Sequence, residues 1–334
     1  MSGRSPYRGV NRNCAFLAVV QLTGCAGHGI LSAISRGAIS VRFTASISPA
    51  EQPSMILCTL SWLLGILLLV DIVVVVLSYS MCWYEYANNC PRLMEQRFHF
   101  KNLRMTGWLI LQELVFNYIT VLSLPFGLLP QRQKVDTKGE TPVLLLHGLF
   151  NNRASWFWLR IALRRAGFHN IATMNLSSWH TEERLTELVA KKVDELRHSL
   201  DVERVHLVGH SMGGVIARNF VQRRGGATKV DRCVCLGSPH VGSKLAPFAL
   251  TRLGQNLIPG SEFLSLLSKA EIPPEVTMTC IFSNKDNMVL PVTSAALPWG
   301  TNVELDGMGH TGLIYRTAAV KATLAALTAT QSAG

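Results

Sequence analysis

Two long apolar runs precede a region in which short apolar stretches alternate with amphipathic ones. The first run extends from Met55 to Ser78, and Asp71 is its single charged residue. A bilayer core needs ~20 apolar residues, so this run predicts a membrane-spanning helix. A very apolar core helix is the less favoured alternative, because runs this long and uncharged are rarely core. Aromatic residues follow the run in the position of an interfacial belt: Tyr79, Trp83, Tyr84 and Tyr86.

The second apolar run, Gly107 to Leu129, is weaker than the first. Two polar residues and a proline interrupt it: Glu113, Asn117 and Pro125. It predicts a second span, a helix lying in the membrane interface, or a helix packed on the first, and the sequence leaves these open. Residues 55–130 are therefore expected to form a membrane-anchoring region with one or two hydrophobic helices. The basic loop between the runs is expected in the cytoplasm, so one span leaves the C-terminal region there and two spans export it.

From residue 142 onward, buried strands alternate with helices, after a polar linker at residues 131–141. The expected strands cover residues 142–146, 171–176, 204–208, 230–236, 276–282 and 302–305. The expected helices cover residues 155–166, 181–200, a segment after Gly214, and 311–327. Repeated βα units predict a mostly parallel sheet flanked by helices, an α/β fold spanning residues 142–330. Active sites in such sheets gather at the carboxyl ends of the strands.

Composition narrows the possible partners. The 334-residue chain is 48% hydrophobic and 16% charged with a net charge of +11, and it contains no nucleic-acid motif. The basic excess favours an anionic membrane surface as partner and argues against nucleic acid. Residues 1–50 lack Asp and Glu, so residues 1–54 are expected to be a low-order targeting segment, or an extension before a true start at Met55. The eight cysteines show no paired spacing, so neither a metal site nor a disulfide framework is expected.

A candidate nucleophile lies in the sequence Gly209-His210-Ser211-Met212-Gly213. An expected strand precedes this stretch and an expected helix follows it. A tight, glycine-flanked turn between a strand and a helix raises a serine hydroxyl out of the sheet. Ser211 is therefore the predicted catalytic nucleophile.

The base and the acid are predicted from loops at later strand ends. His310 lies in a glycine-rich loop before the closing helix, and the chain order Ser, acid, His favours it over His240. Asp286, just past an expected central strand, is the predicted acid, and Asp306 is its rival. An ionised carboxylate there would orient the imidazole and stabilise the imidazolium.

Backbone amides are the predicted oxyanion donors. The amide of Leu149, after the small Gly148, and the amide of Met212 can face the developing charge. His147 is expected to order the turn rather than to catalyse. Candidate substrate-contacting residues follow strand ends: Phe150, Trp179 and His240. No cofactor and no metal are expected.

Four motifs in order resemble those of bacterial triacylglycerol lipases, in particular the class 2 type, and related α/β-hydrolases. They are His147-Gly148-Leu149-Phe150, Gly209 to Gly214, Asp286 to Val289, and Gly309 to Tyr315. The resemblance covers about residues 142–328. It implies the α/β-hydrolase fold, a Ser-Asp-His triad and lipase or esterase activity. The apolar N-terminal third departs from those secreted relatives, and residues 244–274 are expected to form a small cap or helices packed on the sheet.

Together these features predict a membrane-anchored serine carboxylester hydrolase that acts on acylglycerol or other lipid esters through an acyl-enzyme. The alternatives are a thioesterase or lipid-headgroup deacylase of the same fold, or a non-catalytic membrane scaffold. The expected partners are a lipid or ester substrate and a membrane. The sequence leaves open the oligomeric state and the side of the membrane on which the catalytic domain lies.

Overall fold

The computed structural model describes residues 52–89, 99–130 and 137–329. The expected targeting segment at residues 1–54 therefore lies almost wholly outside the described residues, as does half of the linker expected at 131–141. The chain divides into two compact units, residues 1–65 and 66–334. The second unit holds the whole sheet together with the later part of the first apolar run and all of the second.

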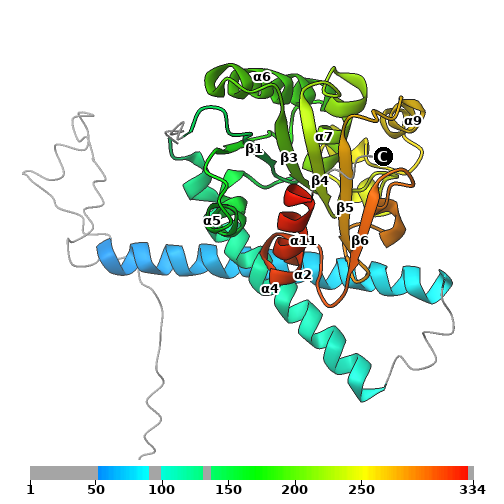
Figure 1. The fold of residues 1–334 in the computed structure, drawn as a ribbon. Coiled ribbons are helices and arrows are strands. Elements are labelled where there is room, and N and C mark those ends of the chain that lie inside the picture. The colour runs from blue at the N-terminus through cyan, green and yellow to red at the C-terminus, as the bar shows by residue number, and fades with distance from the viewer. Residues whose placement is uncertain (1–51, 90–98, 131–136, 330–334) are drawn as a thin grey trace, which may run out of the picture. The chain divides into compact units, whose positions relative to one another are not determined.

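Six parallel strands form one sheet in the order β2-β1-β3-β4-β5-β6 (Figure 1). Their bounds are β1 Val143–Leu146, β2 Ile171–Met174, β3 Val205–His210, β4 Val230–Leu236, β5 Thr277–Ser283 and β6 Thr301–Leu305. Every residue of β1 and β3 is buried, as expected for central strands covered on both faces. The order places β3 centrally, so its carboxyl end lies between the loops that follow β1 and β4.

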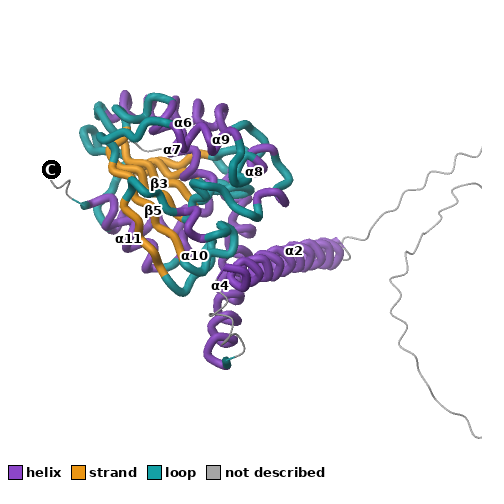
Figure 2. The backbone as a smooth tube through the Cα atoms, turned by 90° about the vertical axis from the view of Figure 1, so that its right-hand side faces the viewer, coloured by secondary structure: helices purple, strands orange, loops and turns teal. Residues whose placement is uncertain are grey.

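Helices cover both faces of the sheet (Figure 2). One core contains side chains of α6 Glu182–Leu200, α7 Met212–Arg223, α8 Arg252–Gln255 and α9 Glu262–Lys269. The other contains side chains of the 3-10 helix η1 Arg153–Trp156, α5 Phe157–Arg165, α10 Gly312–Tyr315 and α11 Thr317–Thr328. Two further 3-10 helices are η2 Ala246–Phe248 and η3 Val292–Ala295. The observed layers confirm the predicted doubly covered parallel sheet.

Helix α6 shows how local sequence sets these elements. Apolar residues recur at helical spacing and are buried against the sheet: Leu185, Val189, Val193, Leu196 and Leu200. The Thr181 hydroxyl caps the start by accepting from the Arg184 amide at 3.2 Å. Asp201 ends the helix in the left-handed conformation (φ 55°).

Two of the expected helices are divided. The closing helix expected over residues 311–327 is α10 followed by α11, because Arg316 takes an extended conformation (φ −72°, ψ 136°) between them. The helix expected over residues 155–166 begins as the 3-10 helix η1. In the region expected to be a cap, Phe263, Leu264 and Leu267 of α9 belong to the main core. These three side chains share that core with side chains of α6 and α7.

The apolar runs form helices α2 Gln52–Asn89 and α4 Phe100–Leu128, both long and apolar enough to cross a membrane. In the second unit, the buried residues of α2 recur on one face of the helix: Asp71, Val75, Ser78, Cys82 and Glu85. The buried residues of α4 are Leu109, Gln112, Glu113, Thr120 and Gly127. Within the second unit (Figure 1), α4 and the part of α2 from residue 66 onward therefore each pack a partly polar face against the loops that follow the strands.

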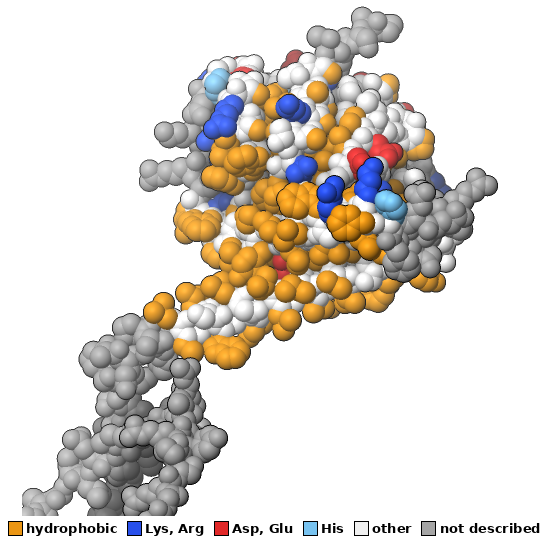
Figure 3. Space-filling view, turned by 90° about the horizontal axis from the view of Figure 1, so that it is seen from below, with side chains coloured by type: hydrophobic (Ala, Val, Ile, Leu, Met, Phe, Trp, Pro, Cys, Tyr) orange, Lys and Arg blue, Asp and Glu red, His pale blue; other side chains and the backbone are white. Residues whose placement is uncertain are grey.

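The opposite faces of these helices are apolar and exposed. The exposed residues between 66 and 128 include Ile66, Leu69, Val70, Val73, Val76, Leu77, Trp108, Leu111, Val115 and Phe126. Figure 3 shows hydrophobic side chains spread across this side of the molecule, with Lys and Arg side chains among them. An apolar surface this extensive is typical of a membrane or protein interaction site.

Candidate active site

Ser211 occupies a strained turn between β3 and α7. Its backbone has φ 53° and ψ −124°, and it is one of three non-glycine residues with positive φ in the described chain. Such a conformation costs on the order of 1–3 kcal/mol and persists only when its surroundings enforce it. Two hydrogen bonds do so here. The Ser211 amide donates to the Leu236 carbonyl at 2.8 Å, and the Gly214 amide donates to the Ser211 carbonyl at 3.1 Å.

The glycines beside Ser211 are required by close packing of the backbone. A Cβ at Gly209 would lie 2.5 Å from the Gly214 Cα, and a Cβ at Gly213 would lie 2.6 Å from the His147 carbonyl oxygen. Neither neighbour is a flexible side chain that could move aside. The Gly-x-Ser-x-Gly spacing thus lets α7 start directly against β3 and the loop after β1, which fixes the position of Ser211.

Asp286 and His310 form a hydrogen-bonded pair at the same edge of the sheet. The His310 Nδ1 lies 2.9 Å from Asp286 Oδ2, and both side chains are buried. The other carboxylate oxygen, Oδ1, accepts from the amides of Met288 (2.8 Å) and Val289 (2.9 Å). The carboxylate is therefore held by three donors. Asp306, the rival acid, is exposed.

His310 lies beside His210, the residue that directly precedes Ser211 in the turn. The rings of His210 and His310 lie 4.6 Å apart between centroids, and His210 Nε2 lies 3.2 Å from the His310 carbonyl oxygen. A Cβ at Gly148 would lie 3.1 Å from both the Ser211 Cβ and the His210 Nδ1. Since Asp286 engages Nδ1 of His310, Nε2 is the ring nitrogen left to face a serine hydroxyl.

The pKa values of His210 and His310 are shifted in opposite directions. Burial alone would lower the pKa of His310, but the carboxylates of Asp286 and Glu113 more than offset it and the net direction is upward. Burial, reinforced by neighbouring His310, holds the pKa of His210 well below its ordinary value. His210 is therefore neutral near pH 7, whereas His310 is suited to accept a proton.

The loop after β1 carries the candidate oxyanion donor Leu149. The Phe150 amide donates to Ser178 Oγ at 2.8 Å and the Asn151 amide to the Gly148 carbonyl at 3.3 Å, whereas no described hydrogen bond uses the Leu149 amide. The second candidate, the Met212 amide, is the first of α7, where helix amides lack an intrahelical acceptor. Both amides lie in backbone segments that pack against each other at Gly148 and Gly213.

His147 orders this loop. Its Nε2 accepts from the Leu176 amide at 2.8 Å, so the proton is on Nδ1, which donates to the Gly148 carbonyl at 2.8 Å. Burial lowers the pKa of His147 to about 4. The neutral His147 ring makes two hydrogen bonds that link the end of β1 to the end of β2, as expected for a turn-ordering residue.

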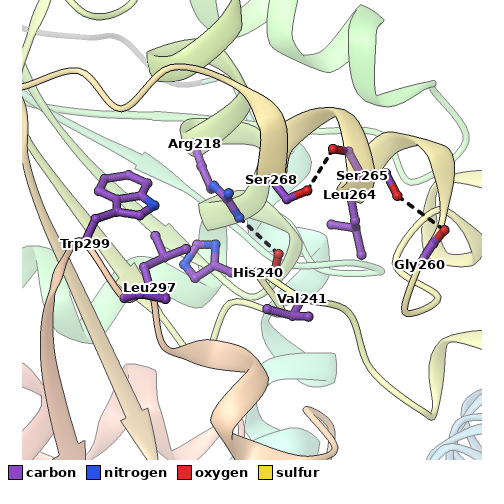
Figure 4. A pocket seen from close by; sticks show the side chains of 10 residues that line it. Arg218, His240, Val241, Gly260, Leu264, Ser265, Ser268, Leu297 and Trp299 are labelled. Atoms are coloured by element: carbon purple, nitrogen blue, oxygen red, sulfur yellow. Dashed lines mark hydrogen bonds between the residues drawn. The ribbon is translucent and has the colours of Figure 1, made fainter.

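The three candidate substrate-contacting residues lie in different environments. Phe150 is 49% exposed and Trp179 is 76% exposed. His240 is buried and lines a cavity of about 350 Å³ with Arg218 and Trp299 (Figure 4). None of Ser211, Asp286 and His310 lines that cavity. The structure thus places His240 at a separate hollow beside α7 and α9, where Arg218 donates to the His240 carbonyl at 3.0 Å.

Side chains of α2 and α4 also contact the loops that hold Asp286 and His310. Ser78 Oγ accepts from Asn287 Nδ2 at 2.7 Å, and Cys82 Sγ lies 3.7 Å from the Asp286 carbonyl oxygen. Glu113 accepts from the Thr311 amide at 2.6 Å. The sequence shows Glu113 as an interruption of the second apolar run, and nothing in the pattern identifies the partners of Ser78, Cys82 or Glu113. Among the described residues, no group of three or more His, Cys, Asp or Glu is arranged to hold a metal ion.

Comparisons with known proteins agree with this architecture. Residues 141–256 match the family model of the α/β hydrolase fold. The lipase B structure from Aspergillus fumigatus is similar with a TM-score of 0.52 and 18% identity, over 59% of this chain and 55% of that one. The mature lipase of Bacillus licheniformis is similar with a TM-score of 0.47 and 19% identity, over 54% and 90%. The strand order, the serine turn and the family match together show that the protein contains a domain of the α/β-hydrolase fold, as the four sequence motifs implied.

Proposed function

We propose that this protein is a serine hydrolase that cleaves carboxylic esters. The observation that carries the proposal is the strained turn of Ser211 beside His310, whose ring is held by the buried Asp286 carboxylate at 2.9 Å. A nucleophile, a base and an orienting acid in this relation are the requirements of acyl transfer.

The geometry supports a two-step reaction. His310 Nε2 accepts the proton of the Ser211 hydroxyl while Oγ attacks the ester carbonyl carbon. The oxyanion accepts hydrogen bonds from the amides of Leu149 and Met212, and one such donor is worth about 10²–10³-fold in kcat. His310 then returns the proton to the leaving alcohol. Water, deprotonated by the same ring, releases the acid and restores Ser211.

The proposed substrates are acylglycerols or other lipid esters at a membrane. Helices α2 and α4 bury their partly polar faces beside the proposed site and expose their apolar faces. A membrane that receives those faces would hold the site near lipid, and the net charge of +11 favours an anionic surface. We therefore propose membrane anchoring through α2, with α4 beside it.

A fluorophosphonate probe tests the proposed chemistry on the full chain in detergent. Wild-type protein should be labelled, and the modified peptide should map to Ser211. The labelled enzyme should lose its activity toward p-nitrophenyl esters. A folded protein that the probe does not label would contradict the proposal and favour a non-catalytic scaffold.

A substrate panel then separates the related reactions of the same fold. The panel compares kcat/KM for acylglycerols of increasing chain length, for lipids with acylated headgroups and for acyl-CoA thioesters. We expect the highest values for acylglycerols presented in anionic vesicles. Higher values for acyl-CoA would instead identify a thioesterase, and higher values for acylated headgroups would identify a deacylase.

The pH dependence follows from the environment of His310. The ring must be neutral to accept a proton, so kcat/KM should rise as pH increases through the pKa of His310. Because Asp286 and Glu113 together raise that pKa from its ordinary value of 6.5 despite burial, the midpoint of the acid limb should lie above pH 6.5. A profile of kcat/KM against pH, with protein integrity checked at each value, measures this midpoint.

A further inference from the structure

Glu113 is a fully buried carboxylate within the second apolar run, at 0% exposure. Its Oε1 accepts from the Thr311 amide at 2.6 Å, and its Oε2 accepts from the Gly312 amide at 3.4 Å. These amides belong to the two residues that directly follow the proposed base, His310. A buried carboxylate requires such partners, and here the partners are the backbone that carries the base.

Three further residues of α4 hold the same segment. Asn117 accepts a hydrogen bond from the Thr311 hydroxyl, and the Thr120 hydroxyl lies 2.7 Å from the Tyr315 hydroxyl. The ring of Phe116 stacks on Tyr315 with centroids 5.0 Å apart. Positions 113, 116, 117 and 120 share one face of a helix. That face contacts the chain from Thr311 to Tyr315.

Backbone packing on the other side of His310 is equally tight. A Cβ at Gly309 would collide with the Glu113 carboxylate and with the Tyr79 hydroxyl of α2. The His310 amide donates to Asn287 Oδ1 at 3.0 Å, and the Asn287 side-chain amide donates to Ser78 of α2. The backbone on both sides of His310 is thus fixed by contacts that lead to α2 or α4.

We propose that Glu113 is a positioning residue for His310, so that α4 helps to set the geometry of the proposed active site. This inference rests on the proposed function, in which His310 is the base. The Glu113 carboxylate fixes the amides of Thr311 and Gly312, and these fix the direction in which the imidazole projects toward Ser211. A misplacement of about 1 Å at a catalytic group can cost about 10²-fold in rate.

Removing the charge of Glu113 should change the pH profile of kcat/KM, which a purely structural role would leave unchanged. The titratable groups around His310 are Asp286 from the loop after β5, Glu113 from α4 and His210 from β3. The Tyr79 hydroxyl of α2 lies close to the neighbouring Gly309. Glu113→Gln keeps the shape and removes one negative charge. The protonated ring then loses stabilisation, so the acid limb of kcat/KM should move to lower pH.

The experiment uses the full chain in detergent and compares Glu113→Gln, Glu113→Ala and Asn117→Ala with wild type. Gly107→Ala is the control, since Gly107 is an exposed residue of the same helix and a Cβ added there meets nothing within 4 Å. We expect Glu113→Ala to lower kcat by about 10²-fold and to change KM by less than about two-fold. Glu113→Gln should reduce kcat less and should move the acid limb. Gly107→Ala should match wild type.

Hydrogen exchange supplies a readout that does not depend on activity. In Glu113→Ala, exchange should accelerate in peptides that cover residues 309–313, because the amides of Thr311 and Gly312 lose their acceptor. Asn117→Ala, which removes the acceptor of the Thr311 hydroxyl, tests whether α4 holds the same peptides should Glu113→Ala not fold. Unchanged exchange in both folded variants would overturn the inference.

The two proposals fail in different ways. A wild-type protein without ester hydrolysis or probe labelling contradicts the proposed function, whereas exchange at residues 309–313 still reports whether Glu113 holds the loop. An active wild type, with Glu113 variants that match it in kcat, pH profile and exchange, contradicts the inference alone.

Discussion

Replacing Ser211 with Ala should lower kcat for ester hydrolysis by about 10⁶-fold, the loss measured when a triad nucleophile is removed elsewhere. The substitution removes only Oγ, because the strained backbone of the turn is held by the Leu236 carbonyl and by the Gly214 amide rather than by the hydroxyl. The turn, the oxyanion amides and the pairing of His310 with Asp286 therefore stay in place. Binding of substrate should change little.

Full-length wild type and Ser211→Ala should be compared on the same p-nitrophenyl ester in the same detergent. Ser199→Ala is the control, since Ser199 is an exposed serine of α6 whose hydroxyl only donates to the Leu196 carbonyl. We expect Ser199→Ala to match wild type in rate and in probe labelling. Hydrolysis by Ser211→Ala within about ten-fold of wild type would contradict the nucleophile assignment, since one factor of ten is only about 1.4 kcal/mol of the barrier.

The sheet was predictable because its signals are local. Each strand is a short apolar run bounded by turn residues, and each of the six observed strands lies within two residues of its expected bounds. The tight turn at Ser211 was predictable for the same reason, since the two glycines that pack against neighbouring backbone lie two positions before and after it in the sequence. A motif whose geometry depends on adjacent residues can be recognised without knowledge of the fold.

The role of α2 and α4 was not predictable from the pattern. Hydropathy reports that a helix is apolar enough to cross a membrane, and both helices meet that criterion. It does not report that one face of α4 carries Glu113, Asn117 and Thr120 against residues almost 200 positions later in the sequence. The polar interruptions were visible, and they weakened the expectation of a second span. Their partners became evident only in three dimensions.

The break in the closing helix at Arg316 is a second feature that the sequence pattern does not reveal. The residues from Thr311 to Leu327 are compatible with one helix, and nothing in their local propensity requires a break. Both α10 and α11 contribute side chains to the same core on the sheet, and α10 also stacks on α4 through Tyr315. Tertiary contacts thus override a continuous helical pattern.

Replacing Asp286 with Asn should lower kcat by about 10⁴-fold through the tautomer of His310. The amides of Met288 and Val289 both donate to Oδ1, so the amide oxygen of Asn would take that place. The side-chain NH₂ group would then face His310 Nδ1, which must accept rather than donate. The ring proton would move to Nε2, and that nitrogen could no longer take the proton of Ser211.

Asp306→Asn is the matched control, because Asp306 is the competing acid by sequence and is exposed in the structure. We expect wild-type kcat/KM for Asp306→Asn, and for Asp286→Asn a deep loss in kcat with KM nearly unchanged. Loss of the Asp286 charge should also lower the pKa of His310, so any residual activity should show its acid limb at lower pH than wild type. A large loss in Asp306→Asn with an active Asp286→Asn would reverse the assignment. It would also imply that the loop between β6 and α10 rearranges during the reaction, since Asp306 lies in that loop and is exposed to solvent in the structure.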